Sequence, residues 1–218
     1  MIKHHLNDEL LMAYSAGTLP EAFSLVVATH VSLCDTCRAR LEGFDAVGGA
    51  VLESIEDEID LSAGSLEATM ARIAAMEQEA AIDTPRPAAL RNALLPGPVR
   101  EYVGGDLDAV QWRSVGGGVR QAILPTSERA SVRLLHIPAG IAVPDHTHGG
   151  LELTLVLQGA FRDEHDRFGP GDVEIATQDV HHTPVAEPGP DCICLAATDA
   201  PLRFSGWLPR LAQPFVNI

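Results

Sequence analysis

Three side chains suited to metal binding lie close together near the start of the chain, spaced as His30-x3-Cys34-x2-Cys37 within helical sequence. Residues three and four apart share one face of a helix, so these side chains are expected to point the same way. Thiolate sulfur and imidazole nitrogen are the ligands that zinc prefers in closed tetrahedral sites. The spacing therefore predicts a zinc site that ties helices together, with His4 or His5 available as the fourth ligand.

Residues 7–81 have the pattern of a run of helices. Residues that favour a helix start mark three of them: Asn7 or Asp8, Pro20, and Asp35 or Thr36. A fourth helix is indicated by apolar residues at helical spacing: Leu66, Met70, Ile73 and Met76. Apolar residues such as Leu10, Leu11, Phe23 and Leu66 could serve a core or a binding surface, and a core role is the expectation for each of them.

The composition and periodicity of the sequence change after these helices. The proline-rich residues 86–100 carry no sustained period and are predicted to be a linker. From residue 101 onward, short strand-like runs alternate with Gly, Pro and Asp, which is typical of a sandwich or small barrel. We therefore predict an α+β multidomain chain, with a small all-α zinc-binding domain over 1–85 and a β domain over 101–218.

A second set of potential metal ligands lies in the β domain, in the pattern Gly140-x5-His146-x-His148-x3-Glu152-x6-Gly159. Residues two apart in an extended strand face the same side, so both imidazoles can enter a barrel. This pattern matches the first cupin motif at every fixed position. The resemblance implies a cupin β-barrel or jelly roll with His146, His148 and Glu152 as metal ligands.

The second cupin motif, G-x5-P-x-G-x2-H, is met only in part, by Gly171-x5-Thr177-x-Asp179-x2-His182. The histidine spacing holds, but a threonine and an aspartate replace the proline and the glycine. The spacing favours His182 over its neighbour His181 as a further ligand. Imidazoles with a carboxylate form a mixed site for zinc or for another divalent transition metal, such as nickel, manganese or iron.

The helical part, with its upstream histidine and H-x3-C-x2-C pattern, resembles the zinc-binding anti-sigma domain. Its pairing with a cupin resembles the ChrR-type zinc-binding anti-sigma factors over nearly the whole chain. The resemblance implies zinc held by His5, His30, Cys34 and Cys37, with His5 favoured over His4. It implies no enzyme activity and no catalytic residues.

The same resemblance implies a function. The helical domain is expected to bind and inhibit an extracytoplasmic-function RNA polymerase sigma factor, and the cupin to be needed for its release in response to singlet oxygen or organic hydroperoxides. Release by conformational change and release by proteolysis both stay open. The alternative is a metal-dependent cupin oxygenase with a zinc-stabilised accessory domain.

The net charge of −15 is unevenly distributed, since residues 1–85 hold four Lys and Arg residues against fifteen Asp and Glu residues. An acidic half repels nucleic-acid phosphates and attracts a basic protein surface, which argues against direct DNA binding. Acidity alone would also serve solubility. No signal-peptide pattern, long apolar run or disulfide framework is seen, so we expect a cytoplasmic protein without a membrane anchor.

Overall fold

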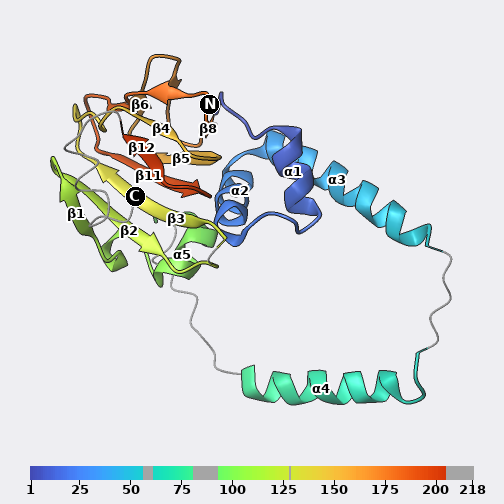
Figure 1. The fold of residues 1–218 in the computed structure, drawn as a ribbon. Coiled ribbons are helices and arrows are strands. Elements are labelled where there is room, and N and C mark those ends of the chain that lie inside the picture. Colours follow the sequence, from blue (N-terminus) through green and yellow to red (C-terminus); the bar gives the residue numbers. More distant parts are fainter. Residues whose placement is uncertain (56–60, 81–92, 128, 205–218) are drawn as a thin grey trace. The chain divides into compact units, whose positions relative to one another are not determined.

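The computed structural model describes residues 1–55, 61–80, 93–127 and 129–204 (Figure 1). Its helices are α1 (Asp8–Ser15), α2 (Glu21–Leu33), α3 (Asp35–Glu53), α4 (Ser65–Ala80), α5 (Gly97–Val103) and the short 3-10 helix η2 (Leu107–Ala109). Its strands are β1 (Arg113–Gly116), β2 (Val119–Leu124), β3 (Ser131–Ile137), β4 (His146–His148), β5 (Glu152–Gln158), β6 (Phe161–Arg162), β7 (Arg167–Phe168), β8 (Val173–Ala176), β9 (His181–His182), β10 (Val185–Ala186), β11 (Cys192–Thr198) and β12 (Leu202–Phe204). The predicted order of helices followed by a β domain is confirmed.

The strands form three antiparallel sheets. The largest has the order β1-β2-β3-β11-β5-β8, and two smaller sheets have the orders β10-β6-β7 and β12-β4-β9. Strand β11 lies in the middle of the large sheet and pairs along its length with β3 and β5. The two cupin motifs meet in one small sheet, because β4 pairs with β9 and places His146 opposite His182.

Packing divides the chain into two compact units, Met1–Gly48 with Leu94–Ile218 and Gly49–Ala93. Helix α3 crosses the boundary between them, and α4 belongs to the second unit. This division differs from the predicted boundary at residue 85, because the first helices share a core with the β domain. That residues 1–85 act as the partner-binding part stays a prediction.

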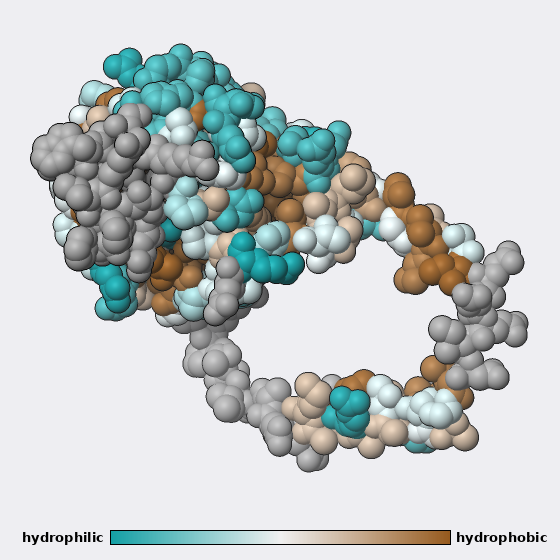
Figure 2. All heavy atoms as spheres, in the orientation of Figure 1, coloured by the Kyte–Doolittle hydropathy of each residue, from teal (hydrophilic) through white to brown (hydrophobic). Residues whose placement is uncertain are grey.

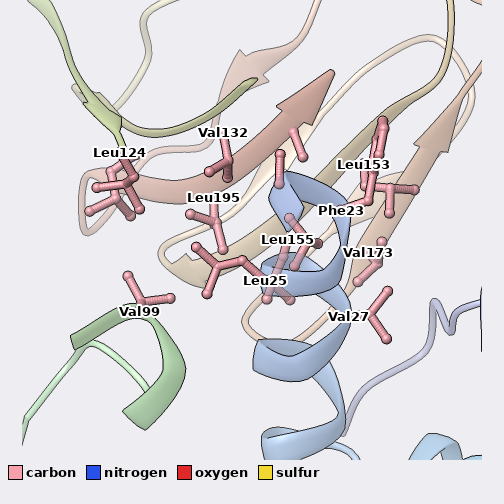
Figure 3. Packing of buried hydrophobic residues seen from close by; sticks show 14 of the residues in the cluster. Phe23, Leu25, Val27, Val99, Leu124, Val132, Leu153, Leu155, Val173 and Leu195 are labelled. Carbon is pink, nitrogen blue, oxygen red and sulfur yellow. The ribbon is translucent and has the colours of Figure 1, made fainter. Parts of the chain in front are cut away.

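Helix α2 joins the first helices to the β domain. It packs against β3, β5 and β11 of the large sheet and against α5. Figure 3 shows the α2 side chains Phe23, Leu25 and Val27 among buried side chains of the sheet, with Leu25 and Val27 on opposite sides of the helix. They belong to one hydrophobic cluster with Leu155 and Leu195, both fully buried. The apolar face of α2 is therefore covered by the sheet and not by other helices alone.

The predicted linker over 86–100 does not extend to residue 100. Residues 86–92 lie outside the described part of the chain, but Leu95 and Val99 are 1% and 0% exposed and belong to the main hydrophobic core. Leu95 directly precedes Pro96, the N-cap of α5, and Val99 lies in the first turn of that helix. Proline is tolerated in a first helical turn, which is why Pro98 does not prevent this helix.

The helix ends follow the predicted capping chemistry in two of three cases. The side chain of Asn7 accepts a hydrogen bond from the Leu10 N–H at 2.9 Å, as an N-cap residue should. Helix α2 begins directly after Pro20. Helix α3 differs from the prediction, because the sulfur of Cys34, and not Asp35 or Thr36, accepts a hydrogen bond from the Cys37 N–H at 3.5 Å across the first turn.

The apolar residues of the helices fall into a buried group and an exposed group. Leu10, Leu11 and Phe23 are buried, as expected of core residues. Leu66 is 67% exposed, so the core role expected for it is wrong for the described part of the chain. Its apolar neighbours along α4 and at the end of α3 are exposed too: Val47, Val51, Leu52, Met70, Ile73 and Met76. None of the described helices is long and apolar enough to cross a membrane.

The shared core predicts that a cavity in α2 destabilises the β domain as well. Replacing Phe23 (2% exposed) by alanine should lower the free energy of unfolding by about 3–5 kcal/mol. Guanidinium unfolding followed by circular dichroism measures this loss. The matched control is Ile123→Ala on β2, a residue that is 45% exposed, and it should cost much less. If the helical signal were lost while the unfolding transition of the β domain stayed unchanged, that result would contradict a core shared by α2 and the sheet.

Two candidate metal centres

The first centre gathers four side chains from the segment before α1, from α2, from α3 and from the residue that joins α2 to α3. His5 precedes α1, His30 lies in the last turn of α2, Cys34 joins α2 to α3, and Cys37 lies in the first turn of α3. One ligand atom from each residue lies within 4.8 Å of all the others. The Nδ1 atom of His5 is 3.3 Å from the Cys34 sulfur and 3.6 Å from the Cys37 sulfur. In a tetrahedral zinc site, nitrogen and sulfur ligands lie about 3.5 Å apart, so these separations fit zinc.

The ring of His30 is oriented for metal binding by a backbone carbonyl of the β domain. Its Nδ1 lies 3.0 Å from the carbonyl oxygen of Gly171, which can only accept, so Nδ1 carries the proton. The Nε2 atom then keeps a free lone pair, and it is buried with no hydrogen-bond partner in the described part of the chain. Burial lowers the pKa of His30 to about 4, which keeps the ring neutral. A neutral imidazole with a free lone pair is what a metal ion requires.

The two buried thiols are better explained by a bound metal ion than by packing in a core without a metal. Burial raises the pKa of Cys37, so its thiolate forms only when a cation lies nearby. Two thiolates and two neutral imidazoles would balance the charge of one zinc ion. Four protein ligands also leave no open position, which is the arrangement of structural zinc sites.

His4 lies outside this cluster. Its Nε2 atom is 3.0 Å from Asp166 and its Nδ1 atom is 3.6 Å from Asp172, both in the β domain. The structure therefore brings His5, and not His4, to the cysteines. Adjacent residues of an extended segment point in opposite directions, which explains why only one of the two can reach them.

The second centre gathers three imidazoles from β4 and β9. The Nε2 atom of His182 lies 3.1 Å from that of His148 and 3.3 Å from that of His146. All three residues are at most 3% exposed. Nitrogen ligands of a tetrahedral zinc ion lie about 3.4 Å apart, so the spacing fits a divalent metal of this size.

Acceptor groups lie behind all three rings, whose Nε2 atoms face one another. The Nδ1 of His146 donates to the carbonyl oxygen of Pro144 at 2.8 Å, the Nδ1 of His182 faces carboxylates, and that of His148 lies 3.4 Å from Glu152. A proton kept on each outer nitrogen would let each ring offer its Nε2 lone pair to a cation.

Glu152 takes a different position from the one its motif implies. Its Oε2 atom approaches the outer nitrogen of His148 at 3.4 Å, and its Oε1 atom accepts a hydrogen bond from Thr154 at 3.0 Å. Burial favours the neutral acid, but His148, His146 and Thr154 outweigh it and lower the pKa of Glu152. The structure thus places an ionised carboxylate behind His148. That Glu152 is itself a metal ligand stays a prediction.

Two carboxylates near His182 were not anticipated from the sequence. Asp163, in the turn between β6 and β7, and Glu174, on β8, lie 2.9 Å and 3.0 Å from the Nδ1 atom of His182. Burial acts to lower the pKa of His182, but these two groups outweigh it and raise the pKa to about 9. A glutamate within the apolar strand sequence DVEIA was the available signal for one of them.

These carboxylates could themselves form a metal-binding group with His182. The same ring serves the histidine cluster through Nε2, and a ring bound there keeps its proton on Nδ1. The carboxylates then accept that proton's hydrogen bond, as outer partners of metal-bound histidines commonly do. The neighbouring His181 is directed elsewhere, with its side chain 56% exposed and its Nδ1 atom 3.2 Å from Asp145. The structure therefore brings His182, and not His181, to the cluster.

Loss of the two thiols should remove the metal from the first centre alone. Replacing Cys34 and Cys37 by serine removes the ligands with the strongest preference for zinc, so zinc should be lost there and kept by the imidazoles of the second centre. Zinc content measured by plasma mass spectrometry on the purified protein tests this. The control is Cys192→Ala, which removes a buried thiol of the β domain and should spare both metals. Equal zinc content in the double variant and the wild type would contradict the assignment.

Comparison with known proteins supports both halves of this description. A family model described as ChrR Cupin-like domain matches residues 101–201. The whole chain is 61% identical over 217 residues to the anti-sigma-E factor ChrR of Cereibacter sphaeroides, covering 100% of this chain and 99% of that protein. The predicted cupin fold of the β domain is thereby confirmed.

A solved structure is similar over almost the same length. It is a chain of the crystal structure of Rhodobacter sphaeroides SigE in complex with the anti-sigma ChrR, with 60% sequence identity and a TM-score of 0.78, covering 91% of this chain and 100% of that one. The fold and the sequence agree with the predicted ChrR-type resemblance, which is confirmed. The chain therefore belongs to the family of ChrR anti-sigma factors.

Proposed function

We propose that this chain binds and inhibits an extracytoplasmic-function sigma factor of the SigE type, and that its cupin domain releases that factor in response to an oxidative signal. The observation that carries the proposal is full-length 61% identity to an anti-sigma-E factor. A relative with 60% identity forms a complex with SigE. The acidic first part of the chain suits a partner whose basic surface otherwise meets nucleic acid.

The exposed apolar stripes of α3 and α4 support this kind of partner. Figure 2 shows apolar residues gathered at the end of α3. On α4, Leu66, Met70 and Ile73 are 67%, 57% and 45% exposed and lie at i, i+4 and i+7, so they share one helix face. Exposed apolar stripes of this spacing are typical of helices that insert into a groove of another protein.

The first metal centre would hold the helices that carry this surface. Cys34 and Cys37 lie at the junction of α2 and α3, so a zinc ion there fixes the direction in which α3 leaves the core. Small helical assemblies commonly need such a metal because their cores are thin. The four ligands leave no position for a substrate, which supports a structural role.

The second centre would supply the response to the signal. A divalent metal bound by the three imidazoles keeps positions open, at which it can bind a small oxidant or its product. His146, His148 and His182 hold the ion, while Asp163 and Glu174 orient the His182 ring. Release of the sigma factor requires that this protein binds it less tightly after the oxidative signal than before it.

The apolar face of α4 provides the direct test of partner binding. The double variant Met70→Asp/Ile73→Asp should weaken binding to a SigE-type sigma factor from the same genome by about 100-fold or more, because it places charges in a desolvated contact. Isothermal titration calorimetry measures the affinity. Ala75→Asp is the matched control, since it adds the same charge to the opposite side of α4 and should bind almost as tightly as the wild type. Undiminished binding by the double variant would remove α4 from the interface.

The cupin site should be needed for release and not for inhibition. The variant His146→Ala/His148→Ala should still repress sigma-dependent transcription in a reconstituted assay, because the exposed helices are unchanged. It should fail to release the factor when singlet oxygen is generated by an illuminated photosensitiser or when an organic hydroperoxide is added. Normal release by this variant would show that the metal centre does not carry the signal.

A further inference from the structure

The two candidate metal centres are connected through the chain by a buried route. His30, of the first centre, donates from Nδ1 to the carbonyl oxygen of Gly171 at 3.0 Å. The next residue, Asp172, accepts hydrogen bonds from the backbone N–H groups of Lys3 at 2.6 Å and His4 at 3.0 Å. This segment leads directly into β8, whose Glu174 lies 3.0 Å from His182 of the second centre.

A second route reaches the same ring from the neighbouring residue. His4, adjacent to the candidate ligand His5, contacts Asp166 at 3.0 Å through Nε2. Asp166 closes a tight turn with Asp163, since the Asp163 N–H donates to the Asp166 carbonyl at 3.1 Å and the Asp166 N–H donates to the Asp163 carboxylate at 2.9 Å. The other carboxylate oxygen of Asp163 lies 2.9 Å from Nδ1 of His182.

Both routes end on one atom, Nδ1 of His182. The first begins at His30, a candidate ligand of the first centre, and the second begins at His4, the neighbour of the candidate ligand His5. A metal ion on the opposite nitrogen of this ring fixes where Nδ1 points, and so fixes the two carboxylates that face it. Those carboxylates belong to the turn and the strand that contact His4 and His30. The N-terminal segment is thereby held in the position that brings His5 to the cysteines.

We propose that these contacts couple the two metal centres, so that a metal ion at the cupin site raises the metal affinity of the N-terminal site. Coupling between sites is reciprocal, so the N-terminal metal should raise the affinity of the cupin site by the same factor. The inference rests on the proposed metal sites and gives the cupin signal a path to the helices. Its test measures metal binding without the sigma factor, so it can fail while the proposed function stands.

The test is a thermodynamic cycle, because spatial connection alone does not establish energetic coupling. Cobalt(II) is the probe on the full chain, since its thiolate absorption band reports only the site that contains Cys34 and Cys37. In the variant His146→Ala/His148→Ala, the cobalt affinity of that site should fall by about 5-fold or more, a typical coupling factor between sites. Chelator competition measures the affinity. An affinity that agrees with the wild type within about 2-fold would overturn the proposal.

The contacts themselves are tested by His4→Ala/Asp166→Ala, which opens the second route at an exposed pair. Asp172 is less suitable, because it also accepts the Gly169 N–H within its own loop. The double variant should keep the cobalt–thiolate spectrum. The coupling factor is the ratio of the cobalt affinities of the N-terminal site with His146 and His148 present and with both replaced by alanine. The double variant should reduce this factor by about half or more. Asp108→Ala, a remote exposed aspartate, is the control and should leave the factor unchanged. An unreduced factor in His4→Ala/Asp166→Ala would overturn the route through the turn.

Discussion

The packing of α2 on the six-stranded sheet determines where the first candidate metal centre lies. Its apolar side is buried among β3, β5 and β11, and Phe23 and Val26 are almost completely removed from solvent. Burying such side chains stabilises the fold by about 1.5–3 kcal/mol each, so α2 cannot shift without opening the core. The last turn of the same helix carries His30, which hydrogen-bonds to Gly171 at the entrance to β8. The first centre is therefore fixed against the strand that leads to the second.

The two centres orient their imidazoles in the same way but differ in whether they leave a coordination position open. In both, an acceptor lies on the Nδ1 side of a ring, so that Nε2 faces the other candidate ligands: a backbone carbonyl for His30 and His146, carboxylates for His182. The first centre completes four protein ligands, two of them thiolates, which leaves no room for another ligand. The second brings three imidazoles together and leaves coordination positions free. This difference is the reason for proposing a structural role for the first centre and a sensing role for the second.

Spacing along the chain was enough to predict the local features, because they depend on neighbours in sequence. The Asn7 cap and the convergence of His30, Cys34 and Cys37 are of this kind, although the extended Cys34 separates α2 from α3 and the three do not share a face of one helix. The burial of α2 against the sheet and the position of the carboxylates behind His182 depend on residues far apart in sequence, so no spacing rule predicts them. The prediction that residues 94–100 belong to a linker was wrong for a related reason. Leu95 and Val99 pack against core residues that are brought to them only by folding.

Helix α3 explains why a structural metal matters for a partner-binding surface. Its first turn is held by Cys37 in the metal cluster and by Arg40, which pairs with Asp8 and with the Leu6 carbonyl. Beyond Gly48 the helix belongs to the other compact unit, and its apolar side chains there are exposed. A helix leaving the core has its direction set by the turn at which it is anchored, because its later residues have no core contacts to correct an error. A metal ion at this cluster is therefore proposed to serve the exposed surface by holding the start of α3.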